Sequence, residues 1–170
     1  SLGSPHGSTG PASIDPRTGK RYGLCFPVLT IEDIAVSAHE ALHAIGISRL
    51  RVVVGPSMGG MAALAYAILF PGEVDNLVTI SAAARATPFA IAIRSVQREA
   101  IRSDPEWKGG DYVPPGGPVT GLRLARKLGL ITYRSAAEWR QRFRRERVAE
   151  RTEGPFGIEF EVEAYLEMHA

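Results

Sequence analysis

VVVGPSMGGMAAL, residues 52–64, is the stretch that decides how the rest of the chain is interpreted. A run of β-branched residues ends at Gly55, and a run rich in Ala, Leu and Met begins at Met58. We therefore expect a strand, a tight turn and a helix. Gly55-Pro56-Ser57-Met58-Gly59, at the turn, has the form G-x-S-x-G. In that context the pattern predicts a nucleophile elbow, in which a strained turn exposes the serine hydroxyl at the end of a strand.

The chemistry expected of this elbow falls to two neighbouring residues. Ser57 is the predicted nucleophile of a reaction that passes through a covalent intermediate. Met58 is predicted to begin the following helix, where free backbone amides can bind a developing oxyanion. The alternative is a tight turn in which the serine side chain only caps the helix, and the sequence leaves that alternative open.

The first half of the chain alternates between helical and strand patterns, which predicts an α/β domain with a partial parallel sheet and flanking helices. Thr30 and Asp33 have the spacing of a capping box at the start of the first helix. The first strand is short, apolar and β-branched, so we expect it to be buried on both faces. We assign residues 1–85 to this domain. Its expected elements are a helix from Thr30, a strand over 51–54, a helix over 58–70 and a strand over 74–80.

The second half of the chain has helical patterns separated by loops rich in Gly and Pro. We expect residues 86–170 to form a helical layer attached to the α/β domain. The expected helices cover residues 88–102, 120–128, 135–147 and 160–169.

The composition excludes several classes of protein. The chain has 170 residues, of which 45% are hydrophobic and 22% charged, and its net charge is only +2. No apolar run approaches the roughly 20 residues of a membrane helix, so we expect no membrane partner. The basic stretch Arg140–Arg147 is interrupted by glutamate, and we expect a solvated helix there and no nucleic-acid partner. The single cysteine, Cys25, suits a reducing compartment and favours a cytoplasmic location.

The histidines do not complete a catalytic triad. A serine nucleophile of this kind needs a later Asp or Glu and then a His, but only His169 follows Ser57. His169 lies on a polar helix, so we expect it to face solvent, and we expect the triad Asp and His beyond Ala170. His39 and His43 have the i, i+4 spacing of metal ligands. With no further ligand evident in the sequence, we expect both at the surface and no metal.

Several spaced motifs resemble one family, the homoserine O-acyltransferases and their serine O-succinyltransferase relatives. These enzymes have the α/β-hydrolase fold with a helical lid, and the likeness runs almost from end to end. The matching segments are Leu2-Gly3-Ser4 with Gly7–Pro11, Asp15–Lys20, the elbow Gly55–Met61, Asp104–Tyr112, Ala125–Tyr133 and Phe160–Leu166.

The resemblance implies a two-step acyl transfer in methionine or cysteine biosynthesis. Ser57 would take an acyl group from acyl-CoA and pass it to the hydroxyl of homoserine or serine. Met58 would supply an oxyanion-hole amide, and Arg126 matches the arginine that binds the amino-acid substrate. The family uses no cofactor apart from acyl-CoA as a co-substrate, and its lid helices commonly form a homodimer. Part of the family's site precedes Ser1 or follows Ala170, so we expect the chain to be a fragment that is inactive alone.

The acyl group and the acceptor stay open. Acetyl-transferring members tend to have Asn at the position of Arg94, whereas a guanidinium there would suit the free carboxylate of a succinyl group. We therefore favour succinyl over acetyl; the alternative is that Arg94 points to solvent. Serine and homoserine differ by one methylene, which a pocket distinguishes by only about 1–3 kcal/mol. The competing hypotheses are an esterase or thioesterase on the same fold, and a truncated scaffold without catalysis.

Overall fold

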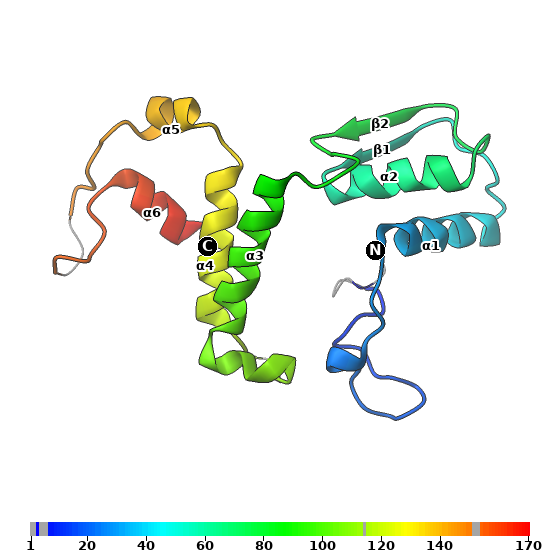
Figure 1. Ribbon diagram of the computed structural model, residues 1–170, viewed down its shortest axis with the longest axis horizontal. Coiled ribbons are helices and arrows are strands. Elements are labelled where there is room, and N and C mark those ends of the chain that lie inside the picture. The colour runs from blue at the N-terminus through cyan, green and yellow to red at the C-terminus, as the bar shows by residue number, and fades with distance from the viewer. Residues whose placement is uncertain (1–2, 4–6, 114, 151–153) are drawn as a thin grey trace. The chain divides into compact units, whose positions relative to one another are not determined.

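The structure is a computed structural model that describes residues 3, 7–113, 115–150 and 154–170 (Figure 1). It contains two compact units, Ser1–Ala86 and Thr87–Ala170. The sequence places the division between residues 85 and 86, which is one residue earlier. Leu2 and Ser4, which open the first motif of the resemblance, lie outside the described residues.

The first unit contains three helices and a two-stranded parallel sheet within its described residues. Thr30 caps α1 (Ile31–Ala44) as the sequence predicts, because its side chain accepts a hydrogen bond from the Asp33 amide at 3.1 Å. The Asp33 carboxylate accepts one in return from the Thr30 amide at 2.7 Å. The elements are η1 (Gly23–Cys25), α1 (Ile31–Ala44), β1 (Val53–Pro56), α2 (Met58–Leu69) and β2 (Leu77–Ile80).

The two strands pair in parallel, with Val53 opposite Leu77 and Pro56 opposite Ile80. Both strands begin later than predicted, because the residues just before them make a side-chain hydrogen bond or an isolated bridge in place of regular strand pairing. The Asn76 side chain donates to the Arg51 carbonyl at 3.0 Å. Before β2, Val74 contributes only an isolated bridge to Leu50.

The prediction that β1 is buried on both faces is wrong for the described chain. Helix α2 packs on both strands and α1 packs on α2, so both helices lie on the same side of the sheet (Figure 1). On the other side, Val54 is 56% exposed, Val78 44% and Ile80 50%. The small core of this unit lies between the helices. It consists of Ala35, Ala65 and Tyr66, with Ile31, Leu42, Leu50, Phe70 and Val74 packed against them.

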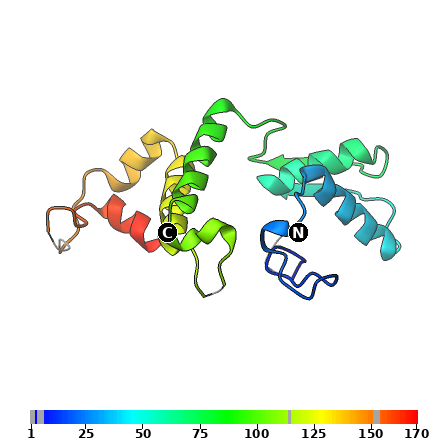
Figure 2. The ribbon, with the colours of Figure 1, turned by 60° about the horizontal axis from the view of Figure 1, so that its bottom comes forward.

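The second unit is helical throughout its regular elements. Helices α3 and α4 lie side by side (Figure 2), and Gly121 allows their close contact. A Cβ atom at Gly121 would lie 2.4 Å from the Ala100 carbonyl oxygen. The Gln97 side chain also donates to the Ala125 carbonyl at 2.8 Å. The elements are α3 (Pro88–Arg102), η2 (Pro105–Gly110), α4 (Val119–Thr132), α5 (Ala136–Phe143) and α6 (Glu161–Met168).

The predicted helix bounds are confirmed for α3 and need correction for the two helices after it. Helix α4 continues through Gly129 to Thr132, because that glycine is a packing contact and does not end the helix. Helix α5 ends at Phe143 and not at Arg147, because Arg144 has a φ of 48° that leaves the helical region. Among the helices that the structure describes, none combines the length and the apolar character that crossing a membrane requires.

Candidate active site

Ser57 lies at the junction of β1 and α2, in the strained turn that the sequence predicts. Its φ of 51° and ψ of −121° belong to a region that favours glycine. Main-chain hydrogen bonds hold it there from both sides. The Ser57 amide donates to the Ile80 carbonyl at 2.9 Å, and the Ser57 carbonyl accepts from the Gly60 amide at 3.0 Å. Such strain persists only where the surroundings enforce it, and it is frequent at active sites.

Two glycines of the elbow let the strand and the helix approach closely. A Cβ atom on Gly55 would lie 2.2 Å from the Gly59 carbonyl oxygen. On Gly60 it would lie 2.6 Å from the Ala82 Cβ atom and 2.7 Å from the Gly55 carbonyl oxygen. Gly59 is different, because a Cβ atom there would meet only the Pro56 ring at 3.5 Å, an ordinary contact. Gly55 and Gly60 are therefore the residues that the geometry of the turn requires.

The serine side chain is free for chemistry in a way that a simple capping residue is not. Ser57 is exposed and its hydroxyl makes no capping hydrogen bond to α2. The alternative that this serine merely caps the helix is therefore wrong. Met58 is the first residue of α2, and the leading amides of a helix have no carbonyl partner within it. Its amide is thus available at the positive end of the helix dipole.

The two predicted arginines belong to the second unit, whereas Ser57 and Met58 belong to the first. Arg94 lies on α3 and Arg126 on α4, and both are exposed. The Arg126 Nε donates to the His169 carbonyl at 2.6 Å. Arg126 also lines an open pocket of about 590 Å³ together with Gln97, Ile101, Leu122 and Arg123.

His169 faces solvent, as expected from the sequence. It is exposed, and its Nδ1 lies 2.9 Å from the Tyr165 carbonyl oxygen, which accepts a hydrogen bond from it. Among the described residues, no carboxylate hydrogen-bonds to the His169 ring as a triad histidine requires. That the base for Ser57 follows Ala170 therefore stays a prediction.

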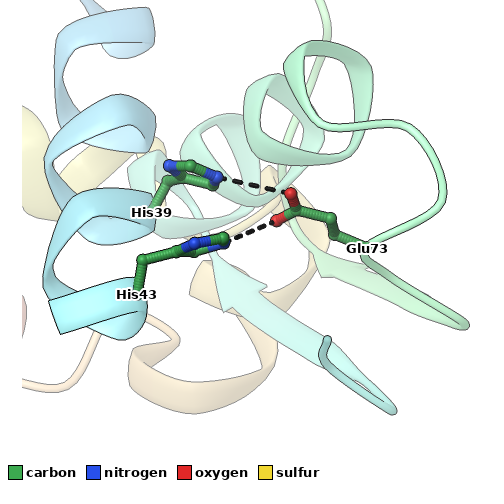
Figure 3. Close-up of side chains that lie close together, drawn as sticks. All are labelled: His39, His43 and Glu73. Atoms are coloured by element: carbon green, nitrogen blue, oxygen red, sulfur yellow. Dashed lines mark hydrogen bonds and ion pairs between the residues drawn. The ribbon is translucent and has the colours of Figure 1, made fainter. Parts of the chain in front are cut away.

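The expectation that His39 and His43 are surface residues is confirmed for the exposed His43 and needs correction for His39. The His39 side chain is only 15% exposed, and His43 is 39% exposed. Both rings point at Glu73, in the turn after α2 (Figure 3). Burial alone would raise the pKa of Glu73, but hydrogen bonds from His39, His43 and Tyr66 lower it below its ordinary value. Glu73 was missed because only the packing of α1 on α2 brings that turn beside the two histidines.

Comparison with known proteins agrees with the elbow geometry. A family model described as the alpha/beta hydrolase fold matches residues 2–167. A serine O-succinyltransferase from Xanthomonas campestris pv. campestris (strain B100) is 58% identical over 100% of this chain and 45% of its own length. A serine O-succinyltransferase from Litchfieldella anticariensis is 55% identical over 100% of this chain and 47% of its own length. The chain thus spans about half the length of the curated relatives it matches.

Solved structures resemble the chain at lower identity. A homoserine O-acetyltransferase from Bacillus anthracis superposes with a TM-score of 0.84 at 30% identity, over 95% of this chain and 43% of that one. Esterase E22 superposes with a TM-score of 0.81 at 29% identity, over 98% of this chain and 46% of that one. These similarities confirm the fold predicted from the strand, the strained serine turn and the helix. The chain belongs to the α/β hydrolase fold family.

Proposed function

We propose that the whole protein is a serine O-succinyltransferase that moves a succinyl group from succinyl-CoA to the hydroxyl of serine. The observation that carries the proposal is the 55–58% identity to proteins of that name along the full chain. The solved homoserine O-acetyltransferase and esterase structures are only 29–30% identical. Homoserine as acceptor and acetyl-CoA as donor are the variants of the proposal that its test must separate.

Ser57 acts as the nucleophile in this scheme. Its Oγ attacks the thioester carbonyl carbon while its proton passes to a general base beyond Ala170, and the Met58 amide binds the oxyanion. The intermediate collapses, the C–S bond breaks and the CoA sulfur leaves with that proton. The amino-acid hydroxyl then attacks the acyl–Ser57 ester and gives its proton, through the base, to the departing Oγ.

The two arginines bind the charged groups of the substrates. Arg126 holds the carboxylate of the amino acid, which is supported by its place at the rim of an open pocket and by the planar fork of a guanidinium. Arg94 pairs with the terminal carboxylate of the succinyl group, a role supported by the match between a guanidinium fork and a carboxylate. A homodimer formed through the helices of the second unit is part of the same proposal.

The test uses the whole protein with succinyl-CoA and L-serine, and follows the release of CoA thiol together with the O-acylated amino acid. Ser57→Ala should lower kcat by about 10⁴-fold or more, as loss of a nucleophile does in serine enzymes. Arg94→Leu should raise the KM for succinyl-CoA about tenfold, as expected for a lost charge-assisted contact, and should leave the KM for acetyl-CoA unchanged. Arg98→Leu, another exposed arginine on α3, is the matched control.

Equal effects of Arg94→Leu on both donors would remove Arg94 from the acyl site. Faster turnover with acetyl-CoA or with homoserine would replace the named substrates and keep the acyl-transfer mechanism.

A second candidate function is ester hydrolysis, favoured by the likeness to esterase E22 at almost the same TM-score and identity as the acetyltransferase. The two functions differ in what accepts the acyl group. Release of free succinate at the same rate with and without serine would support hydrolysis and overturn the transferase proposal.

A further inference from the structure

A compact cluster of three potential metal ligands lies in the first unit, outside the elbow. His39 and His43 project from successive turns of α1, and Glu73 reaches toward them from the turn that follows α2 (Figure 3). Their ligand atoms all lie within 4.8 Å of one another. Two imidazoles and one carboxylate form a donor set that suits divalent zinc and similar transition ions.

Two of the distances between ligand atoms are close to those of a zinc site. Ligands at about 2.0–2.2 Å from a tetrahedral zinc ion are separated from one another by roughly 3.3–3.5 Å. The His39 Nε2 lies 3.3 Å from one Glu73 carboxylate oxygen, and the His43 Nε2 lies 3.5 Å from the other.

The surroundings hold these ligands in place. The His39 ring stacks on Phe70, with centroids 3.7 Å apart and planes 9° apart. The Tyr66 hydroxyl donates to the Glu73 Oε2 at 3.2 Å, which orients the carboxylate as an outer-shell group does in metal sites. Both aromatic residues lie on or directly after α2, so the same packing that joins α1 to α2 preorganises the site.

The second nitrogen of His39 is also informative. Its Nδ1 is buried and makes no hydrogen bond, although the Glu40 carboxylate lies 3.4 Å away. A metal-binding histidine usually donates its other ring N–H to a carboxylate, which leaves the remaining nitrogen free to bind the ion. A small shift of the exposed Glu40 side chain would provide that partner. His43, the more exposed histidine, leaves room for a water ligand.

We propose that His39, His43 and Glu73 bind one zinc ion, with water completing the coordination. The ion fastens the C-terminal half of α1 to the turn between α2 and β2. It does not take part in the reaction at Ser57, because that serine precedes α2 whereas Glu73 follows it. A helix of the length of α2 spans about 18 Å.

The experiment uses the whole protein, stripped with chelator and dialysed, and titrates it with Zn²⁺ by calorimetry and with Co²⁺ by visible absorption. We expect one ion per chain, an intense Co²⁺ band typical of four-coordination, and a melting temperature that rises with the concentration of Zn²⁺. His43→Ala and Glu73→Gln should each weaken binding at least tenfold and remove the thermal shift. His169→Ala, which alters an exposed histidine of the second unit, should change neither.

Two results would overturn the proposal. One is the absence of stoichiometric binding below about 100 µM Zn²⁺. The other is binding that survives both His43→Ala and Glu73→Gln, which would place the ion elsewhere. The metal-free circular dichroism of each variant shows whether it has folded, and unchanged turnover at Ser57 is expected for His43→Ala. If either overturning result is obtained, the cluster is a hydrogen-bonded contact in which Glu73 accepts from both histidines and Tyr66.

Discussion

Two turns, one in each unit, share an unusual backbone conformation and have very different surroundings. Ser57 has φ 51° and ψ −121°, and Arg144 has φ 48° and ψ −124°. Arg144 ends α5, is exposed, and donates its amide to the Arg140 carbonyl at 3.0 Å. Ser57 instead sits between a strand and a helix whose backbones almost touch.

The comparison shows at which of the two positions glycine could replace the strained residue without loss of a proposed role. Glycine adopts a positive φ about as readily as a negative one, and nothing in the structure gives Arg144 a role that glycine would lose. At Ser57, glycine would relieve the same strain but would remove the hydroxyl that the proposed reaction needs. Strain at Ser57 is therefore enforced by the close contacts at Gly55 and Gly60 and by the main-chain hydrogen bond to Ile80. Strain at Arg144 involves only the end of its own helix.

The largest effect is expected from breaking the frame around Ser57. Gly55→Ala forces a Cβ atom against the Gly59 carbonyl, a main-chain atom that cannot rotate away. We expect the whole protein to lose about 3 kcal/mol of unfolding free energy, at the upper end of overpacking costs, measured by urea denaturation. Gly59→Ala is the control. Its Cβ atom has ordinary space, and alanine in a helix gains up to about 1 kcal/mol over glycine. Equal losses for both variants would show that close packing is not what the first glycine provides.

A smaller effect, of opposite sign, is expected from relieving the strain itself. Ser57→Gly and Arg144→Gly should each stabilise the protein by about 1 kcal/mol, because relief of about 1–3 kcal/mol of strain is only partly offset by the extra chain entropy that glycine gives the unfolded state. Thermal melting measures both variants. Activity separates them, because Ser57→Gly should abolish turnover and Arg144→Gly should retain it. A destabilised Ser57→Gly variant would mean that the hydroxyl supports the turn.

The smallest effect is expected at a third turn, in the second unit, which is stabilised by hydrogen bonds to a carboxylate. The Asp104 side chain accepts hydrogen bonds from the Gly121 amide at 2.8 Å and the Glu106 amide at 2.9 Å. These bonds lower the pKa of Asp104. The stabilisation is therefore present above the unfolded pKa, near 4, and is lost as the pH falls through the lower folded pKa.

Asp104→Asn removes the charge and keeps the shape. The melting temperature of the variant should be lower than that of the wild type at pH 7, and the difference should shrink toward pH 3. Parallel melting curves across this range would show that the charge of Asp104 does not contribute.

The parts of the fold that sequence predicts well are those decided by neighbouring residues. The Thr30–Asp33 capping box and the bounds of α3 depend on residues within one helix. The strand, turn and helix around Ser57 depend on a contiguous pattern of β-branched residues and glycine. Local patterns of this kind predict structure well because they depend little on tertiary packing.

The parts that escaped prediction depend on contacts between distant segments. Gly129 looks like a helix end, but its missing side chain accommodates Gln97 of α3. Arg144 gives no sequence signal of a positive φ, because arginine rarely adopts one. Glu73 joins the two histidines only because α1 packs on α2. The burial of β1 depends on what covers the second face of the sheet, and periodicity carries no information about that.

The hydrogen bond from Ser57 to Ile80 bears on how the protein is made. A ribosome delivers β1 and α2 before β2, so the amide of Ser57 first emerges without the carbonyl that later accepts it. Until the parallel pair forms, the hydrogen bond from the Ser57 amide is missing, and only the close contact between β1 and α2 restrains the strained backbone. Contacts between segments separated by a whole helix form late in folding. A half-synthesised chain therefore holds Ser57 less firmly, and the full set of main-chain hydrogen bonds around it arises only when the strand pair is complete.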